Sequence, residues 1–129
     1  MKTKVFVYGS LLPGLGNHGV IASSETLGAA TTEPIYTMVS LGAFPAIVEG
    51  GETAIHGEVY EVDSDTLAAL DRLEGHPRFY KRMLIWLAGG ESSAYTYLLP
   101  PERIADRHLL EVPSGNWYEH LREQGELPW

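Results

Sequence analysis

The stretch that decides the fold is DSDTLAALDRLEG, residues 63–75, because it is the clearest helix in a chain whose other patterns predict strands. Asp63 and Ser64 are typical N-cap residues, and Gly75 ends the pattern. Between them, leucines repeat at helical spacing, at Leu67, Leu70 and Leu73. We therefore predict a helix over residues 64–74 with one apolar face.

Strand-like segments lie on both sides of this helix. Runs rich in β-branched and aromatic residues, bounded by glycine or proline, predict strands over residues 4–11, 35–41, 46–49, 55–62, 80–88 and 93–99. Helical turns are expected over 18–24 and after Pro101, and residues 117–122 are a short helix or an irregular cover. Helices are missing between most strands, which excludes a doubly wound fold and predicts an α+β sheet or a small barrel.

The length and composition fit one soluble domain spanning residues 1–129. The chain has no cysteine, which excludes disulfide scaffolds, cysteine-ligated zinc and thiol catalysis. Its 17 acidic and 9 basic residues give a net charge of −8, which argues against a nucleic-acid partner. The longest apolar run, residues 83–90, is far below the roughly 18 residues of a spanning helix, so we expect no membrane partner and a cytoplasmic location.

Glu74 is the candidate on the helix that carries chemistry. At 100° per residue, Leu70 centres the leucine stripe and Glu74 falls about 40° from it, on the side that faces the core. Burial disfavours the anion and the negative end of the helix dipole repels it, so we expect a raised pKa. Such a carboxyl suits a general acid/base near neutral pH. The alternative, which helix geometry alone favours, is a Glu that turns to solvent at a frayed helix end.

The second candidate is the transition from strand to loop at Tyr8, Gly9, Ser10 and Leu11. A buried strand that runs into glycine lets the backbone turn, so that successive N–H groups can surround an anion. The alternative is a tight turn without a ligand. Ser10 is expected to bind or to turn rather than to act as a nucleophile, because the G-x-S-x-G pattern is absent.

Other patterns are weaker. Gly14, Gly16 and Gly19 spell G-x-G-x-x-G, but they lack the strand–helix–strand context of a dinucleotide site. The five histidines show no metal-ligand spacing, so we expect no metal. Asp71, at the edge of the leucine stripe, is expected to be solvated or paired with Arg72 or Arg78. Trp86 and Trp117 are expected in the core or its cover.

Four blocks, in order, carry a family resemblance: VFVYGSL at residues 5–11, GEVY at 57–60, LDRLE at 70–74 and FYKR at 79–82. Together they resemble the γ-glutamylcyclotransferase family, over nearly the whole chain. They are most similar to its small branch, which includes γ-glutamylamine cyclotransferase and AIG2-like proteins. The resemblance implies a small mixed β-barrel with flanking helices and no cofactor.

The resemblance also implies a reaction and a site. The α-amine of a γ-glutamyl group attacks its own γ-carbonyl, which releases 5-oxoproline and a free amine, an acyltransferase or lyase type of cyclisation. By position, Glu74 matches the catalytic glutamate. The substrate-binding positions are Tyr8, Gly9, Ser10, Leu11, Asn17 and Tyr80. Leu11 stands where larger relatives have Asn, so their substrate preference is not carried over.

Two alternatives to this enzyme stay open. One is a module on the same fold that binds a small molecule or a partner without turnover. The other is a hydrolase in which Glu74 activates water. Neither the leaving amine nor the oligomeric state can be read from the sequence.

Overall fold

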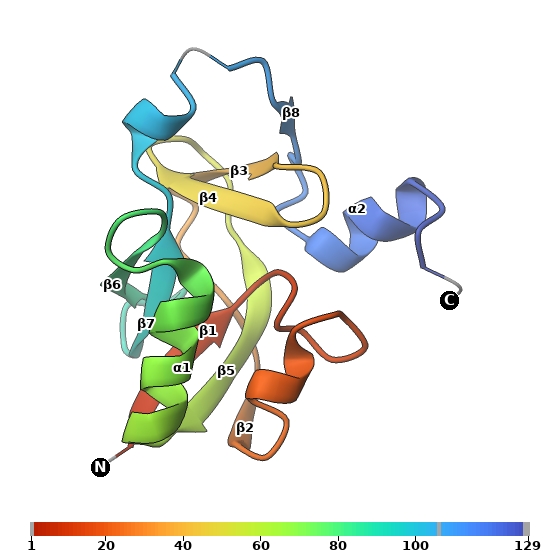
Figure 1. Ribbon diagram of the computed structural model, residues 1–129. Coiled ribbons are helices and arrows are strands. Elements are labelled where there is room, and N and C mark those ends of the chain that lie inside the picture. Colours follow the sequence, from red (N-terminus) through yellow and green to blue (C-terminus); the bar gives the residue numbers. More distant parts are fainter. Residues whose placement is uncertain (1, 106, 128–129) are drawn as a thin grey trace.

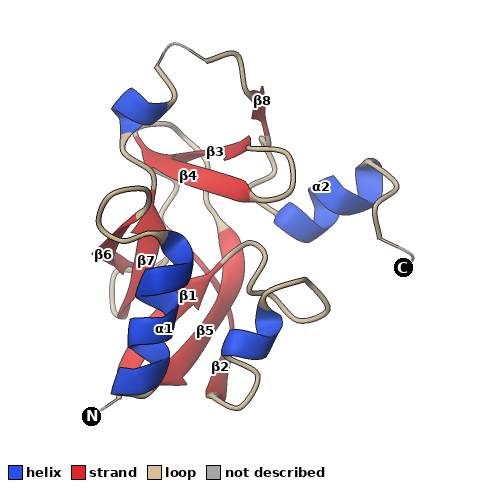
Figure 2. Ribbon diagram, viewed as in Figure 1, coloured by secondary structure: helices blue, strands red, loops and turns tan. Residues whose placement is uncertain are grey.

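The computed structural model describes residues 2–105 and 107–127, which form two sheets flanked by helices (Figures 1 and 2). The elements in chain order are β1 (Thr3–Val7), η1 (His18–Val20), β2 (Glu25–Thr31), β3 (Tyr36–Ser40), β4 (Pro45–Glu49), β5 (His56–Val62), α1 (Ser64–Glu74), β6 (Lys81–Trp86), β7 (Ser93–Leu98), η2 (Pro101–Arg103), β8 (Leu110–Glu111) and α2 (Trp117–Glu123). None of the helices in these ranges is long and apolar enough to cross a membrane.

The larger sheet has the order β2-β5-β1-β7-β6, and the smaller one has the order β4-β3-β8. The larger sheet is mixed, because β1 pairs with β7 in parallel and every other neighbour is antiparallel. This order sets the ends of β1 and β7 beside each other, although the two strands are far apart in the sequence. The α+β class is therefore confirmed.

The barrel is not confirmed. In the described ranges β2 and β6 are the edge strands of the larger sheet. One isolated bridge, between Thr32 and Leu87, links the residues that follow these two strands. No ladder closes the sheet there. A strand pattern in a sequence does not show whether the two outer strands of a sheet pair with each other, which is why the expectation of a barrel was wrong.

Helix α1 spans residues 64–74 as predicted. Asp63 Oδ1 accepts a hydrogen bond from the Thr66 N–H at 2.8 Å, and Gly75 takes the left-handed conformation (φ 68°) that ends the helix. Leu70 is fully buried against the larger sheet. Helix α1 lies across one face of that sheet (Figure 1), and its last turn ends at the upper margin of the face.

The core has two parts, one on each face of the larger sheet. Strand β1 is buried on both faces, as predicted: Val5 and Val7 contact the cluster under α1, while Phe6 contacts the cluster between the two sheets. Trp117 of α2 is buried in that second cluster, which confirms its expected place in the core.

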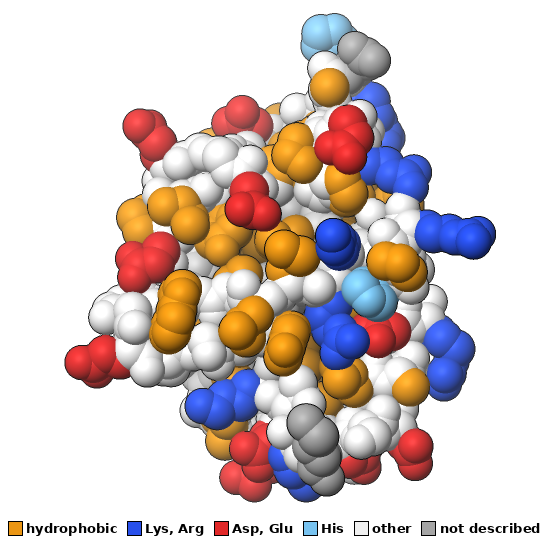
Figure 3. Space-filling view, turned by 90° about the vertical axis from the view of Figure 1, so that its left-hand side faces the viewer, with side chains coloured by type: hydrophobic (Ala, Val, Ile, Leu, Met, Phe, Trp, Pro, Cys, Tyr) orange, Lys and Arg blue, Asp and Glu red, His pale blue; other side chains and the backbone are white. Residues whose placement is uncertain are grey.

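Trp86 differs from its expected place. It is 58% exposed and belongs to the edge strand β6, together with Leu84, which is 55% exposed. Figure 3 views the molecule from the left-hand side of Figure 1, and hydrophobic side chains gather across the middle of that face. An alternating strand pattern cannot reveal that an edge strand has one face left uncovered.

Two strands were missed by the sequence. Strand β2 is mostly exposed, and its glycine and alanine residues have low strand propensity; its pairing with β5 holds it in place, with a bulge between Thr26 and Gly28. Strand β8 has two residues, and within the described ranges its ladder partner is β3.

Candidate functional site

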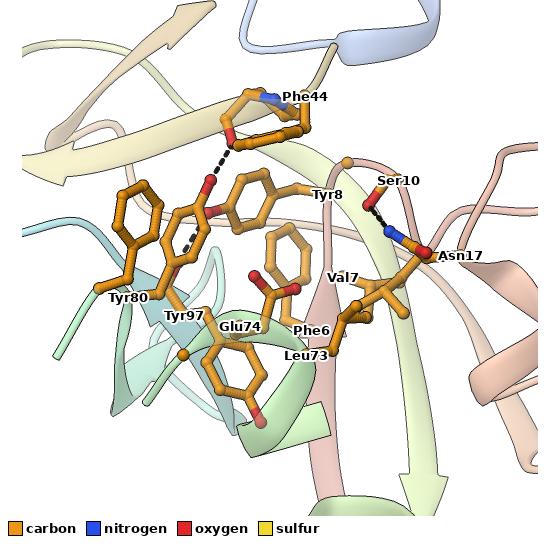
Figure 4. Close-up of a pocket in the computed structure, with 15 residues that line it drawn as sticks. Phe6, Val7, Tyr8, Ser10, Asn17, Phe44, Leu73, Glu74, Tyr80 and Tyr97 are labelled. Atoms are coloured by element: carbon orange, nitrogen blue, oxygen red, sulfur yellow. Dashed lines mark hydrogen bonds between the residues drawn. The ribbon is translucent and has the colours of Figure 1, made fainter. Parts of the chain in front are cut away.

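A cavity of about 260 Å³ opens where the end of β1, the last turn of α1 and the start of β4 meet (Figure 4). The residues that line it are Phe6, Val7, Tyr8, Gly9, Ser10, Leu11, Asn17, Phe44, Pro45, Leu73, Glu74, Gly75, Phe79, Tyr80 and Tyr97. Every residue that the sequence singled out for the site is among them. The structure thus brings the loop after β1 and the end of α1 to one cavity, although they are more than 60 residues apart.

Glu74 is the acidic group of the cavity. Its carboxyl points toward the centre, with the side chains of Tyr8 and Tyr80 on one side of it (Figure 4). Burial raises the pKa of Glu74 from its ordinary 4.5 to about 7. The raised pKa expected from burial is confirmed, and the alternative of a solvated, frayed Glu is wrong. At neutral pH this carboxyl therefore exchanges a proton readily in either direction.

The hydroxyls of two tyrosines that line the cavity, Tyr8 and Tyr80, are held by hydrogen bonds to the main chain. The Tyr8 hydroxyl donates a hydrogen bond to the main-chain oxygen of Tyr97 at 2.6 Å, and the Tyr80 hydroxyl donates one to the main-chain oxygen of Pro45 at 2.8 Å. Burial, together with the nearby Glu74, raises the pKa of both phenols above its ordinary value. Both tyrosines stay neutral at physiological pH and serve as hydrogen-bonded walls.

Gly9 allows this wall to close. A Cβ atom at residue 9 would lie 2.8 Å from the ring carbons Cγ and Cδ of Pro45, closer than any real contact. The loop after β1 and the first residue of β4 therefore touch at a point where only glycine fits.

The loop after Gly9 is closed by Asn17. The main-chain N–H of Asn17 donates a hydrogen bond to the main-chain oxygen of Ser10 at 2.9 Å. The side-chain amide of Asn17 donates a second one to Ser10 Oγ, also at 2.9 Å. Within the described parts of the chain, the backbone N–H groups of Ser10 and Leu11 have no acceptor. Both residues line the cavity, and successive N–H groups at a turn of this kind can hold an anionic group.

Tyr97 and the apolar residues around the cavity were missed by the sequence. Tyr97 lines the cavity from β7, and its hydroxyl donates to Asp71 Oδ1 at 2.7 Å. Asp71 also forms an ion pair with Arg82, with 3.3 Å between Oδ1 and Nε. The expected pairing of Asp71 with Arg72 or Arg78 is thus wrong, because both of its partners come from neighbouring strands of the larger sheet.

Phe44 and Phe79 had no signal of their own. Residues 42–45 lay between two predicted strands, and Phe79 appeared only in the FYKR block of the family resemblance, with no role of its own. Neither residue type is unusual at such positions, so their meeting at one cavity depends on the folded chain.

The cavity offers little to a metal. Among the described residues, no group of three or more His, Asp or Glu side chains is placed to hold an ion. Glu74 is also the one lining side chain that carries a formal charge. The chemistry that the lining side chains and N–H groups support is proton transfer beside a bound, partly anionic group.

Comparison with known proteins agrees with this architecture. Residues 5–119 match the family described as gamma-glutamyl cyclotransferase, AIG2-like. A Vibrio cholerae protein named as a γ-glutamylcyclotransferase is 40% identical over 123 residues, 94% of this chain and 100% of that protein. The γ-glutamylcyclotransferase family protein YtfP of Escherichia coli is 37% identical over 116 residues, 90% of this chain and 96% of that protein. A solved structure from Pyrococcus horikoshii, 22% identical, superposes with a TM-score of 0.78 over 98% of this chain and 99% of that one, a likeness that shows the fold.

Proposed function

The chain belongs to the gamma-glutamyl cyclotransferase, AIG2-like family, and from that premise we propose that it cyclises a γ-glutamyl compound to 5-oxoproline with Glu74 as the general acid/base. The observation that carries the proposal is the half-buried Glu74 carboxyl, which has a pKa of about 7 and faces a cavity lined by the loop after β1. A carboxyl of this pKa serves as base and as acid in turn.

The attacking nitrogen must lose two protons. The carboxylate of Glu74 first takes a proton from the substrate α-ammonium group, and the free amine then attacks the γ-carbonyl carbon. The protonated carboxyl returns that proton to the leaving nitrogen as the old C–N bond breaks, and the ring nitrogen gives its second proton, through the same carboxylate, to the released amine, which departs as an ammonium ion. The products are 5-oxoproline and a free amine, with no water consumed. Since the substrate supplies its own nucleophile, a chain without cysteine needs no serine nucleophile either.

The backbone donors support the charged intermediate. Attack places negative charge on the γ-carbonyl oxygen, and preorganised N–H groups stabilise such a charge strongly in a site that excludes water. We assign this role, or the binding of the substrate α-carboxylate, to the N–H groups of Ser10 and Leu11. Asn17 positions the loop through Ser10, while Tyr8 and Tyr80 wall the site. The ring closes within one molecule, so the main task of the cavity is to fold the substrate into its reactive shape.

An assay of the full chain with γ-glutamyl amino acids and γ-glutamyl amides tests the proposal, with 5-oxoproline as the product measured. We expect 5-oxoproline with at least one class of substrate. If the substrates bind and raise the thermal midpoint without product, the chain is a binding module instead. If glutamate appears and takes up oxygen from ¹⁸O-labelled water, Glu74 activates water and the chain is a hydrolase. The cytoplasmic location and the lack of a nucleic-acid partner stay predictions from the composition.

A further inference from the structure

The turn after β1 is held by hydrogen bonds to three successive main-chain oxygens, those of Gly9, Ser10 and Leu11. Their partners are, in the same order, the Leu12 N–H, the Asn17 N–H and Nδ1 of His18, each at 2.9 Å. The peptide bonds of this turn are trans, so the N–H group of each peptide points opposite to its C=O group. Each hydrogen bond to an oxygen therefore also sets the direction of the N–H group in the same peptide.

His18 is the donor in its contact with the turn. A carbonyl oxygen has no proton to give, so the bond to Leu11 needs a proton on Nδ1 of the ring. The rings of His18 and Tyr60 also lie edge to face, with 6.1 Å between their centroids. The Tyr60 hydroxyl in turn donates a hydrogen bond to Glu58 Oε1 at 2.7 Å. Since Tyr60 and Glu58 both belong to β5, His18 links the turn to the larger sheet.

The Leu11–Leu12 peptide carries the effect of His18 to the cavity. Its oxygen accepts from His18, and its N–H donates to the Gly9 oxygen. The Gly9 oxygen is thereby fixed, so the N–H of Ser10, which belongs to the same peptide, is directed away from the inside of the turn. Ser10 lines the cavity, whereas His18 is not one of the described residues that line it. His18 therefore acts on the site through the turn and not by contact with a ligand.

We propose that His18 is a positioning residue, which orients the Ser10 N–H for the site through its hydrogen bond to Leu11. This inference rests on the proposed function, in which that N–H binds the γ-carbonyl oxygen or the α-carboxylate of the substrate. Without the bond from His18, the Leu11–Leu12 peptide is held only by its N–H. Backbone donors stabilise a developing charge strongly only when they are oriented in advance, so loss of this bond is costly.

Variants that move the side-chain donor test this role. His18→Asn has its amide nitrogen at the position of Nδ1, so its kcat/KM should stay within about threefold of the wild type. His18→Gln carries the amide one bond farther out and His18→Leu has no donor, so both should lose about ten- to a hundredfold. Equal losses in His18→Asn and His18→Leu, or wild-type turnover by His18→Leu, would overturn the proposal. Because asparagine transfers no proton, rescue by His18→Asn also excludes His18 as a general acid/base.

His56→Leu is the matched control. Nδ1 of His56 also contacts a protein oxygen, Thr31 Oγ1 at 3.4 Å, but His56 is exposed and is not among the described residues that line the cavity. This variant should keep the wild-type kcat/KM. Urea unfolding of all four variants compares their stability, and His18→Gln keeps the comparison if His18→Leu does not fold.

¹⁵N NMR of the full chain tests the hydrogen bond without turnover. The neutral ring of His18 should carry its proton on Nδ1, and long-range ¹⁵N–¹H correlations identify the protonated nitrogen. The amide signal of Ser10 should move in His18→Leu and His18→Gln and stay in place in His18→Asn and His56→Leu. A proton on Nε2, or an unmoved Ser10 signal in both donor-loss variants, would overturn the proposal. If the wild type forms no 5-oxoproline from any substrate, the proposed reaction fails, and the NMR result alone then decides whether His18 orients this N–H.

Discussion

The hydroxyl of Tyr97 donates a hydrogen bond to Asp71 at 2.7 Å, and this bond joins β7 to α1 one turn before Glu74. The main-chain oxygen of the same tyrosine accepts a hydrogen bond from Tyr8 at 2.6 Å. Tyr97 thus contacts both parts of the site: its hydroxyl binds α1, the helix that carries Glu74, and its main-chain oxygen binds the Tyr8 hydroxyl. In Figure 4 the Tyr97 hydroxyl points away from the cavity, toward the helix, so its function here is to position other groups.

Tyr97→Phe should therefore reduce turnover more than binding. The change removes the bond to Asp71 and keeps both the ring and the main-chain oxygen. We expect a loss of about 1.5–3 kcal/mol in the free energy of unfolding, as for a hydrogen bond to a charged group. We also expect kcat to fall by about tenfold with little change in KM, because a small misplacement of a catalytic group is costly. Urea unfolding and 5-oxoproline kinetics measure the two effects.

Tyr95→Phe is the matched control for this variant. Tyr95 lies two residues earlier on the same strand, and its ring contacts the Arg82 guanidinium, a contact that phenylalanine keeps. Asp71→Asn retains an oxygen acceptor for Tyr97 and should lose less activity than Asp71→Ala. If Tyr97→Phe unfolds more easily but keeps the wild-type kcat, the bond serves the fold alone.

Glu74→Gln should abolish most of the turnover. Gln keeps the size and polarity of the side chain but cannot exchange a proton, and general acid/base catalysis contributes about 10²- to 10⁴-fold. The matched control is Glu123→Gln, because Glu123 is likewise the last residue of a helix but is exposed and is not among the residues that line the cavity. Retention of more than about a tenth of wild-type kcat by Glu74→Gln would contradict the assigned role.

The same residue should make stability depend on pH. The pKa of Glu74 is about 7 in the folded protein against an ordinary value of 4.5, so the folded state holds the proton more tightly than the unfolded state does. Its contribution is therefore complete below pH 4.5 and is lost as the pH rises through about 7. We expect the wild type to lose about 2–3 kcal/mol relative to Glu74→Gln across this window. Urea unfolding of both proteins at pH 4.5, 6 and 8 measures this difference, and parallel curves would show that Glu74 ionises as freely when folded as when unfolded.

The sequence predicted what depends on neighbouring residues. Helix α1 was predicted with its observed bounds because the Asp63 cap, the leucine spacing and Gly75 all lie within one segment. The same spacing placed Glu74 on the buried side, and burial does raise its pKa. The loop after β1 was recognised because a buried strand that ends in glycine is a local feature.

What the sequence missed depends on strand order. The parallel pairing of β1 with β7 brings Tyr97 close to Tyr8, and the residues of neither strand predict this pairing. Asp71 was assigned to arginines close in sequence, whereas its partner Arg82 comes from the strand beyond β7. The prediction of a barrel was wrong because it also depends on strand order: a barrel would need β2 and β6 to pair along their lengths.

Gly9→Ala should be among the more damaging small substitutions in the chain. The new methyl group would lie 2.8 Å from two ring carbons of Pro45, and a proline ring at the start of β4 cannot rotate away. The carbonyl of that same proline accepts the Tyr80 hydroxyl, so a shift of Pro45 also disturbs the cavity wall. We expect a loss of about 1–3 kcal/mol in the free energy of unfolding, as for overpacking, together with a higher KM. Gly16→Ala is the control in the same loop: nothing lies within 4 Å of its added Cβ, and its φ is not positive. That variant should unfold within about 0.5 kcal/mol of the wild type, as is usual for a surface substitution. Urea unfolding and substrate kinetics of the two variants side by side decide the matter, and equal stability would mean that the loop and β4 are free to separate.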